Sequence, residues 1–306
     1  MIVRYALRRF VSMVPVLFIV SIIVFMMIHL TPGDPVRVMM GKSGASAEEI
    51  DNVREQLGLN DSLPVQYVHF IQDLVTGNLK SIRTQQPVTQ EFWDRFPSTL
   101  ELALLSLVVA TVAGFVLGIV AATHQNSWID SLTMIISLLG VSVPGFWLAL
   151  LLVFVFAISL DWLPATGTEG WKSLVLPVTV LAVEQIALIA RLVRANMVEV
   201  LRDDYIRTAR AKGLRERSVL VGHALRNALL PSITLLGLNF GYLLAGAVIV
   251  ETIFARPGIG RLIVEGILSK DFPLVQGAVL LTAVVYLLVN LITDISYGFF
   301  DPRVRH

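Results

Sequence analysis

Cysteine is absent from this sequence, and charge is scarce. None of the 306 residues is cysteine, which excludes disulfides, iron–sulfur clusters and thiol catalysis. Charged residues make up 15% of the chain, whereas ordinary soluble domains carry about 25%. The charges gather between long uncharged stretches, which is the distribution expected of segments dissolved in lipid. The net charge of +1 provides no field to attract nucleic acid, so we expect no nucleic-acid partner.

Recognisable catalytic motifs are also missing. Gly41-Lys42-Ser43 looks like the tail of a phosphate-binding loop, but Val36 stands where the leading glycine belongs and no strand precedes it. There is no His-Glu-x-x-His motif, and the serine-nucleophile elbow fails at Pro144, the last position of the Gly140–Pro144 run. The sequence therefore predicts no ATP site, no metal site, no catalytic residue and no cofactor in this chain.

Long apolar segments are what the sequence has instead. A bilayer core needs about 20 apolar residues per helix. Six segments qualify, namely Phe10–Leu30, Leu102–Thr123, Leu132–Leu160, Leu174–Ala190, Leu229–Val250 and Leu274–Ile292. The third is long enough to be tilted or broken, and Pro144-Gly145 lies inside it. The sequence predicts an all-α membrane protein with six transmembrane helices.

Lysine and arginine indicate which side of the membrane each loop faces. Three arginines precede the first span, seven basic residues lie in 196–228, and two more lie in the C-terminal tail. An even number of spans puts these three segments on one side, so both termini should be cytoplasmic. The first apolar run has 21 uncharged residues and no small-x-small site after it, which favours a retained anchor over a signal peptide.

The long loop 31–97 should then lie outside. The capping box Ser46-Ala-Glu-Glu49 predicts a helix that ends at Gly58, and a second helix should begin at Pro64 and stop near Gly77. Each has an apolar face, made of Ile50, Val53 and Leu57 in the first and of Tyr67, Ile71 and Leu74 in the second. We expect a small outer cap; the alternative is a solvated loop held only at its ends.

Polar residues inside the predicted spans suggest a transport path. Glu184 is the one acid well inside a span, and Asn239 is a further polar residue there. A proton relay through Glu184 would indicate an ion-coupled transporter; the simpler alternative is a watery cavity or a hydrogen bond from a neighbouring helix. Trp147 and Tyr242 join Glu184 and Asn239 as possible path residues, with packing as the competing role.

Pairs of glycines in two spans point to close helix packing. Gly114 and Gly118 are one turn apart in the second span, and Gly237 and Gly241 have the same spacing in the fifth. Small residues at this spacing let membrane helices approach closely.

The basic segment 196–228 has the pattern of a helical hairpin. Met197–Lys212 is polar and free of proline and glycine, Gly213 stands where a helix C′ residue would, and Asp203 and Arg207 form an i,i+4 pair. A second helix could run over Ser218–Asn227. Ile206, Ala209 and Gly213 make a partly small, partly apolar strip. The segment could lie on anionic lipid, or it could enter a partner's groove through that strip.

Several motifs carry a resemblance to a known family. The run Asp204-Tyr-Ile-Arg-Thr-Ala-Arg-Ala-Lys-Gly213-Leu214 resembles the signature loop of binding-protein-dependent ABC importer permeases of the peptide/nickel subfamily. Further matches are Thr31-Pro-Gly-Asp-Pro35, Thr99-Leu-Glu-Leu-Ala103, Trp162-Leu-Pro164, His223-Ala-Leu-Arg-Asn-Ala-Leu-Leu-Pro231, Arg256-Pro-Gly-Ile-Gly260 and Asp301-Pro-Arg303. The general Glu-Ala-Ala start reads Arg207-Thr208-Ala209 here.

The resemblance implies the first of two permease subunits of a bacterial inner-membrane importer with a type I fold. It would work with a second, similar permease, two cytoplasmic ATPases that bind ATP and Mg, and an extracytoplasmic binding protein. Residues 1–30 would be an anchor, 31–97 an outer loop, and 98–306 a five-helix core. Carried over onto this sequence, the ATPase-coupling residues are Asp204, Arg207, Ala209, Arg210 and Gly213.

The substrate implied by the resemblance is a small peptide, either a di- or oligopeptide or glutathione. Importers of nickel and of oligosaccharides share these motifs and remain alternatives. An ion-coupled secondary transporter is the rival from a different class, and it would need no ATPase.

Overall fold

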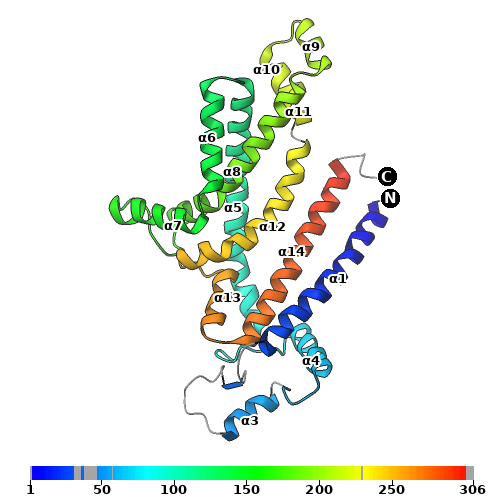
Figure 1. The fold of residues 1–306 in the computed structure, drawn as a ribbon, viewed down its shortest axis with the longest axis vertical. Coiled ribbons are helices and arrows are strands. Elements are labelled where there is room, and N and C mark those ends of the chain that lie inside the picture. Colours follow the sequence, from blue (N-terminus) through cyan, green and yellow to red (C-terminus); the bar gives the residue numbers. More distant parts are fainter. Residues whose placement is uncertain (1, 31–35, 38–46, 57, 229, 301–306) are drawn as a thin grey trace. The chain divides into compact units, whose positions relative to one another are not determined.

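The computed structural model describes residues 2–30, 36–37, 47–56, 58–228 and 230–300, which form helices joined by turns and one isolated bridge between Lys80 and Pro87 (Figure 1). By internal contacts the chain divides into two compact units. Unit 1 comprises 1–5, 100–256 and 289–306; unit 2 comprises 6–99 and 257–288. The predicted features at Ser46, Leu57, 31–35, 41–43 and 301–303 lie outside the described residues.

All six predicted spans fall on helices. These are α1 (Ile2–His29), α5 (Val88–Thr123), α6 (Trp128–Ser142) with α7 (Gly145–Leu152), α8 (Lys172–Val200), α12 (Leu230–Ile253) and α14 (Phe272–Phe300). Among the described residues, four helices are each long and apolar enough to cross a membrane, and they lie in α1, α5, α8 and α14. The α6–α7 pair is a fifth candidate if it counts as one span, and α12 contains the shorter apolar helix Phe240–Ile253.

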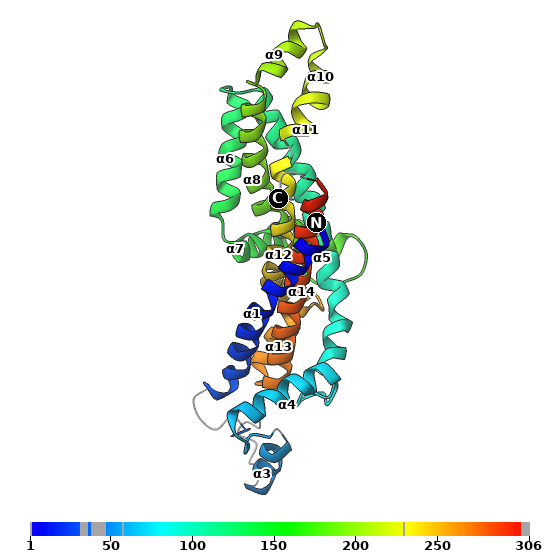
Figure 2. The same ribbon diagram turned by 90° about the vertical axis from the view of Figure 1, so that its right-hand side faces the viewer.

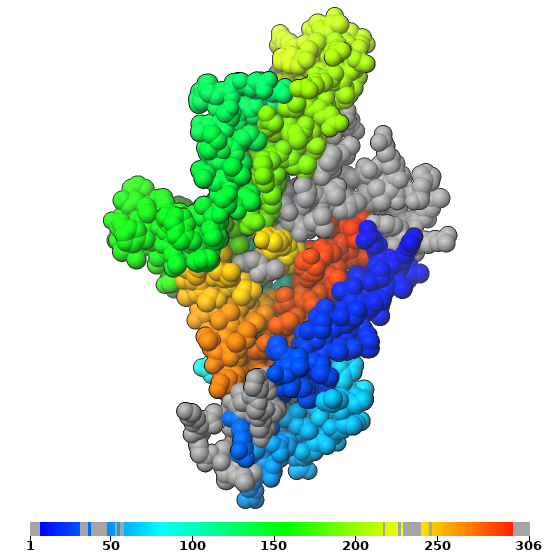
Figure 3. All heavy atoms as spheres, viewed as in Figure 1, coloured from blue at the N-terminus to red at the C-terminus, as the bar shows by residue number. Residues whose placement is uncertain are grey.

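The third predicted span is broken at Pro144. Its two halves meet at an angle of 101°, and the second continues from α7 into the π-helix η1 (Val153–Ser159). Val143 and Pro144 both have extended backbone, with ψ of 119° and 133°. Proline disfavours helical geometry at the residue before it, so the α6 helix ends there and a new helix begins. In Figure 3 the green α7 segment projects from the end of α6.

Unit 1 is built on α8, which packs against α6, α7 and α12. The glycine spacing in α5 serves this packing, because a Cβ at Gly114 would lie 2.7 Å from Ile189 and one at Gly118 would lie 2.7 Å from Val193. Gly140 of α6 also lies against α8, near Ala187. The prediction of close approach is thus confirmed for the first glycine pair. The side chains around Gly237 are outside the described part.

Unit 2 contains most of α1, α3 (Ala47–Gln56), α4 (Leu63–Thr76), α13 (Ile259–Leu268) and the first part of α14. An apolar cluster links Phe25 of α1, Phe70 and Leu74 of α4, and Leu280 of α14. Figures 1 and 2 both show α4 close to the C-terminal end of α1. The helix predicted between Pro64 and Gly77 is therefore confirmed: it begins one residue before Pro64 and ends at Gly77, whose φ is +76°.

The basic segment differs from the prediction in its first helix. Met197–Lys212 is not one helix: α8 ends at Val200, and α9 (Asp204–Ala211) begins after a turn. The second helical stretch runs through α10 (Glu216–Ser218), the π-helix η2 (Val219–Ala224) and α11 (Leu225–Ala228), close to the predicted 218–227. The fourth span is correspondingly longer than predicted, because α8 continues past Ala190.

Candidate functional site

The α9 helix has one face buried in its own chain. Ile206 is fully buried and Ala209 is 7% exposed, and both belong to an apolar cluster with Met197 of α8 and with Val219 and Ala224 of η2. The apolar strip predicted to enter a partner's groove therefore faces the chain's own core at these two positions. Apolar burial of this kind fixes the helix on the end of α8.

The opposite face of α9 is exposed and charged. Asp204, Arg207 and Arg210 all lie on the surface. Arg207 Nη1 forms an ion pair with Asp204 Oδ1 at 3.5 Å. The predicted i,i+4 pair between Asp203 and Arg207 is wrong. Asp203 occupies the N-cap position with an extended backbone, and its main-chain carbonyl accepts the N–H of Arg207 at 3.2 Å.

A second ion pair closes the turn after α9. Arg210 donates Nε–H to Glu216 Oε2 at 3.2 Å and Nη2–H to Oε1 at 2.6 Å, across the turn at Gly213. These hydrogen bonds hold the pKa of the Glu216 carboxyl below its ordinary value and raise the pKa of Arg210. Gly213 is exposed with φ of +77°, and a Cβ there would meet nothing within 4 Å. The left-handed backbone conformation therefore explains the glycine at this position, since the surroundings leave room for a side chain.

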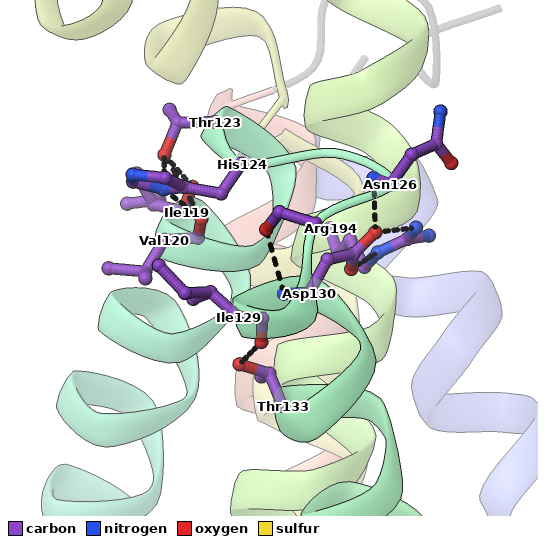
Figure 4. A network of polar contacts seen from close by, with 10 residues as sticks. Ile119, Val120, Thr123, His124, Asn126, Ile129, Asp130, Thr133 and Arg194 are labelled. Carbon is purple, nitrogen blue, oxygen red and sulfur yellow. Dashed lines mark hydrogen bonds and ion pairs between the residues drawn. The ribbon is translucent and has the colours of Figure 1, made fainter.

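The end of α8 is held by an acid that sequence reasoning missed. Arg194 of α8 binds Asp130 of α6 through two hydrogen bonds, and Asp130 also accepts the backbone N–H of Asn126 at 3.1 Å (Figure 4). The 124–131 loop has no lysine or arginine, so it gives no information on sidedness, and the sequence predicts no role for Asp130. Its partner Arg194 lies 64 positions further along the chain, so no local pattern predicts the pair. Asn196 Nδ2 also donates to the carbonyl of Ala228, at 3.3 Å.

The predicted path residues lie in unit 1, and two of them meet. Tyr242 of α12 points its hydroxyl at Glu184 Oε1 of α8, at 3.5 Å. Glu184 is half-buried, Tyr242 is 54% exposed, and Trp147 of α7 is 50% exposed. The simpler expectation for Glu184, a contact from a neighbouring helix, matches this geometry. Asn239 lies in α12, and its side chain is outside the described part.

Two family models match the chain. The model for the N-terminal part of binding-protein-dependent transport system membrane components matches residues 2–103. The model described as "Binding-protein-dependent transport system inner membrane component" matches residues 114–306.

Individual relatives match over the full length. The chain is 42% identical over 304 residues to the glutathione transport system permease protein GsiC of Escherichia coli (strain K12), covering 99% of both chains. The GsiC protein of Shigella flexneri serotype 5b is 41% identical with the same coverage.

Solved structures share the fold at low identity. An inward-facing MetNI methionine ABC transporter structure matches with a TM-score of 0.61 at 16% identity, over 70% of this chain and 98% of that chain. A structure of an amino acid ABC transporter with histidines gives a TM-score of 0.53 at 17% identity, over 70% and 94%.

Proposed function

The chain belongs to the binding-protein-dependent inner membrane components, the multi-pass permeases of ABC importers, and from this premise we propose that it imports small peptides, glutathione among them. The observation that carries the substrate class is the 42% identity over 99% of the chain to permeases named for glutathione transport. The family lacks ATPase activity of its own, so ATP hydrolysis belongs to partner subunits, and a binding protein delivers the substrate.

The proposed assembly contains a second, similar permease and two cytoplasmic ATPases, embedded in membrane lipid. Both termini and the 196–228 segment would face the cytoplasm, and the 31–97 loop would face the outside, where the binding protein docks. In this arrangement residues 1–30 are an anchor and 98–306 the five-helix core. The absence of native cysteine makes this topology directly testable. A membrane-impermeant thiol reagent should label Asp61→Cys from outside and Lys212→Cys only after the membrane is opened; the reverse pattern contradicts the topology.

The ATPase-coupling role is proposed for α9, and the burial pattern divides its residues into two groups. Asp204 and Arg207 present exposed polar groups to the partner. Ala209 acts from beneath, because its small side chain lets α9 lie on α8 and η2. Arg210 and Gly213 shape the turn that ends the helix. Closure of the ATPases would pull on α9, and the packed cluster would pass that movement to α8.

From α8 the movement has two routes into the membrane part of unit 1. Arg194 ties α8 to the start of α6 through Asp130, and α6 leads to the break at Pro144 and to Trp147 on α7. Glu184 lies further along α8, beside Tyr242 of α12. Rigid-body rocking of these helices about a central site is alternating access. We propose Trp147, Glu184, Asn239 and Tyr242 as candidates for lining that path.

Reconstitution of the full transporter tests the proposed function. Proteoliposomes containing this permease, its partner permease, the ATPases and the binding protein should take up labelled glutathione or a dipeptide only with ATP. Uptake of a nickel chelate or an oligosaccharide in place of peptide would reassign the substrate within the family. Uptake by this chain alone, driven by an ion gradient, would overturn the ATP-driven mechanism.

The Glu184→Gln variant separates the two energy sources. A proton relay requires the carboxyl, so its removal would abolish uptake. The ATP-driven mechanism needs no proton exchange at Glu184, and a glutamine there keeps an oxygen that can accept the Tyr242 hydroxyl, so we expect near-normal uptake by Glu184→Gln. Tyr242→Phe, which keeps the ring and removes the hydroxyl, is the matched control for the contact.

A further inference from the structure

A cavity of about 480 Å³ lies within unit 2, at the end of α1. Its volume is in the range of small-molecule sites, which is roughly 300–1,000 Å³. Part of the wall is apolar and includes Phe25, Ile28 and Phe70, whereas α3, α4, α14 and the turn near Lys80 also contribute polar side chains. None of the residues proposed above for transport or coupling lines it.

Acceptor groups dominate the polar part of this cavity. Glu55, Asp61 and Asp73 contribute three carboxylates, against Lys80 as the one lysine or arginine among the lining residues. Asp73 is half-buried, and its carboxylate has no hydrogen bond or ion pair within the described chain. Asp61 has a histidine nitrogen, His69 Nδ1, at 3.8 Å.

Two buried glutamines have their donors already committed. Gln66 gives its amide N–H groups to the carbonyls of Leu59 and Asp61, at 3.2 and 2.8 Å. Gln276 is 5% exposed, and it gives its amide N–H groups to the carbonyls of Val24 and Phe25, at 3.1 and 3.0 Å. The Gln276 amide can therefore offer the cavity only its oxygen, which has no partner among the described residues.

The same reasoning fixes the role of His29. Because the Gln66 Nε2 group is the donor to two carbonyls, its Oε1 must accept the hydrogen bond of 2.9 Å from His29 Nε2. In the neutral ring, Nδ1 is then an acceptor. This Nδ1 is buried without a partner. A buried polar atom in this state costs free energy unless a donor reaches it.

We propose that this cavity binds a primary ammonium group. An ammonium group carries three N–H donors, one positive charge and no acceptor, which complements the carboxylate of Asp73, the oxygen of Gln276 and the free nitrogen of His29. The apolar wall formed by Phe25, Ile28 and Phe70 would hold the carbon chain attached to the ammonium group. The group could come from the N-terminus of a short peptide or from an ethanolamine lipid headgroup, since both present the same donors.

Calorimetric titration of the whole transporter in phosphatidylcholine nanodiscs tests this proposal without the binding protein or ATP. The probe is the dipeptide alanyl-phenylalanine, and its N-acetylated form is the matched ligand control. We expect saturable binding of the free amine. The acetylated form, which has lost the charge and two N–H donors, should bind with an affinity at least about tenfold lower. Equal binding of the two forms, or no binding of either, would overturn the proposal.

Variants locate the binding in this cavity and separate it from the transport path. Asp73→Asn should weaken binding of the dipeptide about tenfold, whereas Asp94→Asn, an exposed aspartate of α5 outside the cavity, should leave it unchanged. Should Asp73→Asn fail to fold, Glu55→Gln on the exposed rim takes its place, with Glu48→Gln as its control. Wild-type affinity in Asp73→Asn, or in Glu55→Gln where that variant replaces it, refutes the site.

A change of lipid identifies the source of the ammonium group. Phosphatidylcholine carries a trimethylammonium group without N–H donors, so it cannot compete for the site. If phosphatidylethanolamine nanodiscs lower the apparent affinity for the dipeptide, the lipid headgroup occupies the cavity in the membrane. If the affinity is unchanged, the site is reserved for soluble amines. Because binding is measured without transport, a negative result here leaves the proposed importer function untouched.

Discussion

Arg194 and Asp130 form a two-pronged ion pair between α8 and α6, with Nε to Oδ1 at 2.5 Å and Nη2 to Oδ2 at 2.6 Å. Asp130 is 4% exposed and the Arg194 side chain is one-quarter exposed. Parallel N–H···O bonds of this kind fix orientation as well as distance. The pair therefore makes the start of α6 follow the end of α8, to which the proposed coupling helix is attached.

Asp130→Asn should destabilise the permease, because it leaves the Arg194 charge partly buried with no carboxylate beside it. The expected loss is roughly 2–3 kcal/mol, less than the value of about 3–5 kcal/mol for fully buried pairs because Arg194 keeps some water. Thermal unfolding of the purified transporter in detergent measures the loss. Asp161→Asn is the matched control, since Asp161 is exposed and has a φ of +50° that asparagine tolerates.

The charge-exchanged double variant Asp130→Arg with Arg194→Asp sharpens the result. If the ion pair is what holds α6 to α8, the double variant should be more stable than either single variant. Stability of Asp130→Asn equal to that of the wild type would show that the pair contributes little.

The ion pair between Arg210 and Glu216, rather than either residue alone, should be needed to couple ATP hydrolysis to transport. Arg210→Glu places two acids across the Gly213 turn, and we expect fewer substrate molecules transported per ATP hydrolysed. Glu216→Arg in the same chain reverses the pair and should restore much of that ratio. Failure of the exchange to restore it would indicate that Arg210 contacts the ATPase directly.

The same pair should show a defined pH dependence. The Arg210 guanidinium lowers the pKa of Glu216 from its ordinary 4.5, so the ion pair is fully present above that value. It is lost as the pH falls through the lowered pKa, when the carboxyl takes up a proton. Amide hydrogen exchange of residues 210–216 in detergent, corrected for its intrinsic pH dependence, should therefore become faster only below pH 4.5. Glu216→Gln should remove this pH dependence.

Gly213 should tolerate asparagine and reject valine. Its φ of +77° is the constraint, because a Cβ at this position meets open space. A β-branched residue pays roughly 1–2 kcal/mol or more in this left-handed region, whereas asparagine adopts it more readily. We expect Gly213→Val to hydrolyse ATP with reduced transport and Gly213→Asn to remain coupled. Loss of coupling in both variants would mean that the absence of a side chain is what the partner requires.

The spans and the helix α4 could be predicted because each depends on a local pattern. A run of about 20 apolar residues has one stable form in lipid, and Pro64 and Gly77 mark the ends of α4 by their own backbone preferences. Pro144 likewise indicated a possible break. The proline alone could not predict the angle of 101° between α6 and the helix after the break, because that angle depends on how α7 packs against α8 and α12.

Features set by distant contacts were missed or misplaced. The turn at Leu201–Asp203 contains no proline or glycine that would predict it. The helix breaks there so that Ile206 and Ala209 can reach the cluster around Met197. The apolar strip on α9 was visible in the sequence, but its spacing is the same whether it meets a partner or its own chain. The Asp130–Arg194 pair joins residues 64 positions apart, beyond any local pattern.

Gly114→Ala should destabilise the helix packing in unit 1, although alanine is the better helix former by about 1 kcal/mol. The new Cβ would lie 2.7 Å from both Cβ and Cγ2 of Ile189, and Cβ atoms are fixed by the backbone. Overpacking of this kind costs about 1–3 kcal/mol, which outweighs the gain in helix propensity.

Gly222→Ala is the control, because the nearest atom to a Cβ there is Ser218 Oγ at 4.0 Å. With no clash, only the gain in propensity remains, and the unfolding temperature of Gly222→Ala should match or exceed that of the wild type. The Gly114→Ala protein should unfold at a lower temperature in the same detergent. A rise in both variants would show that α5 and α8 can move apart at no cost, and that the glycine spacing in α5 does not serve close packing.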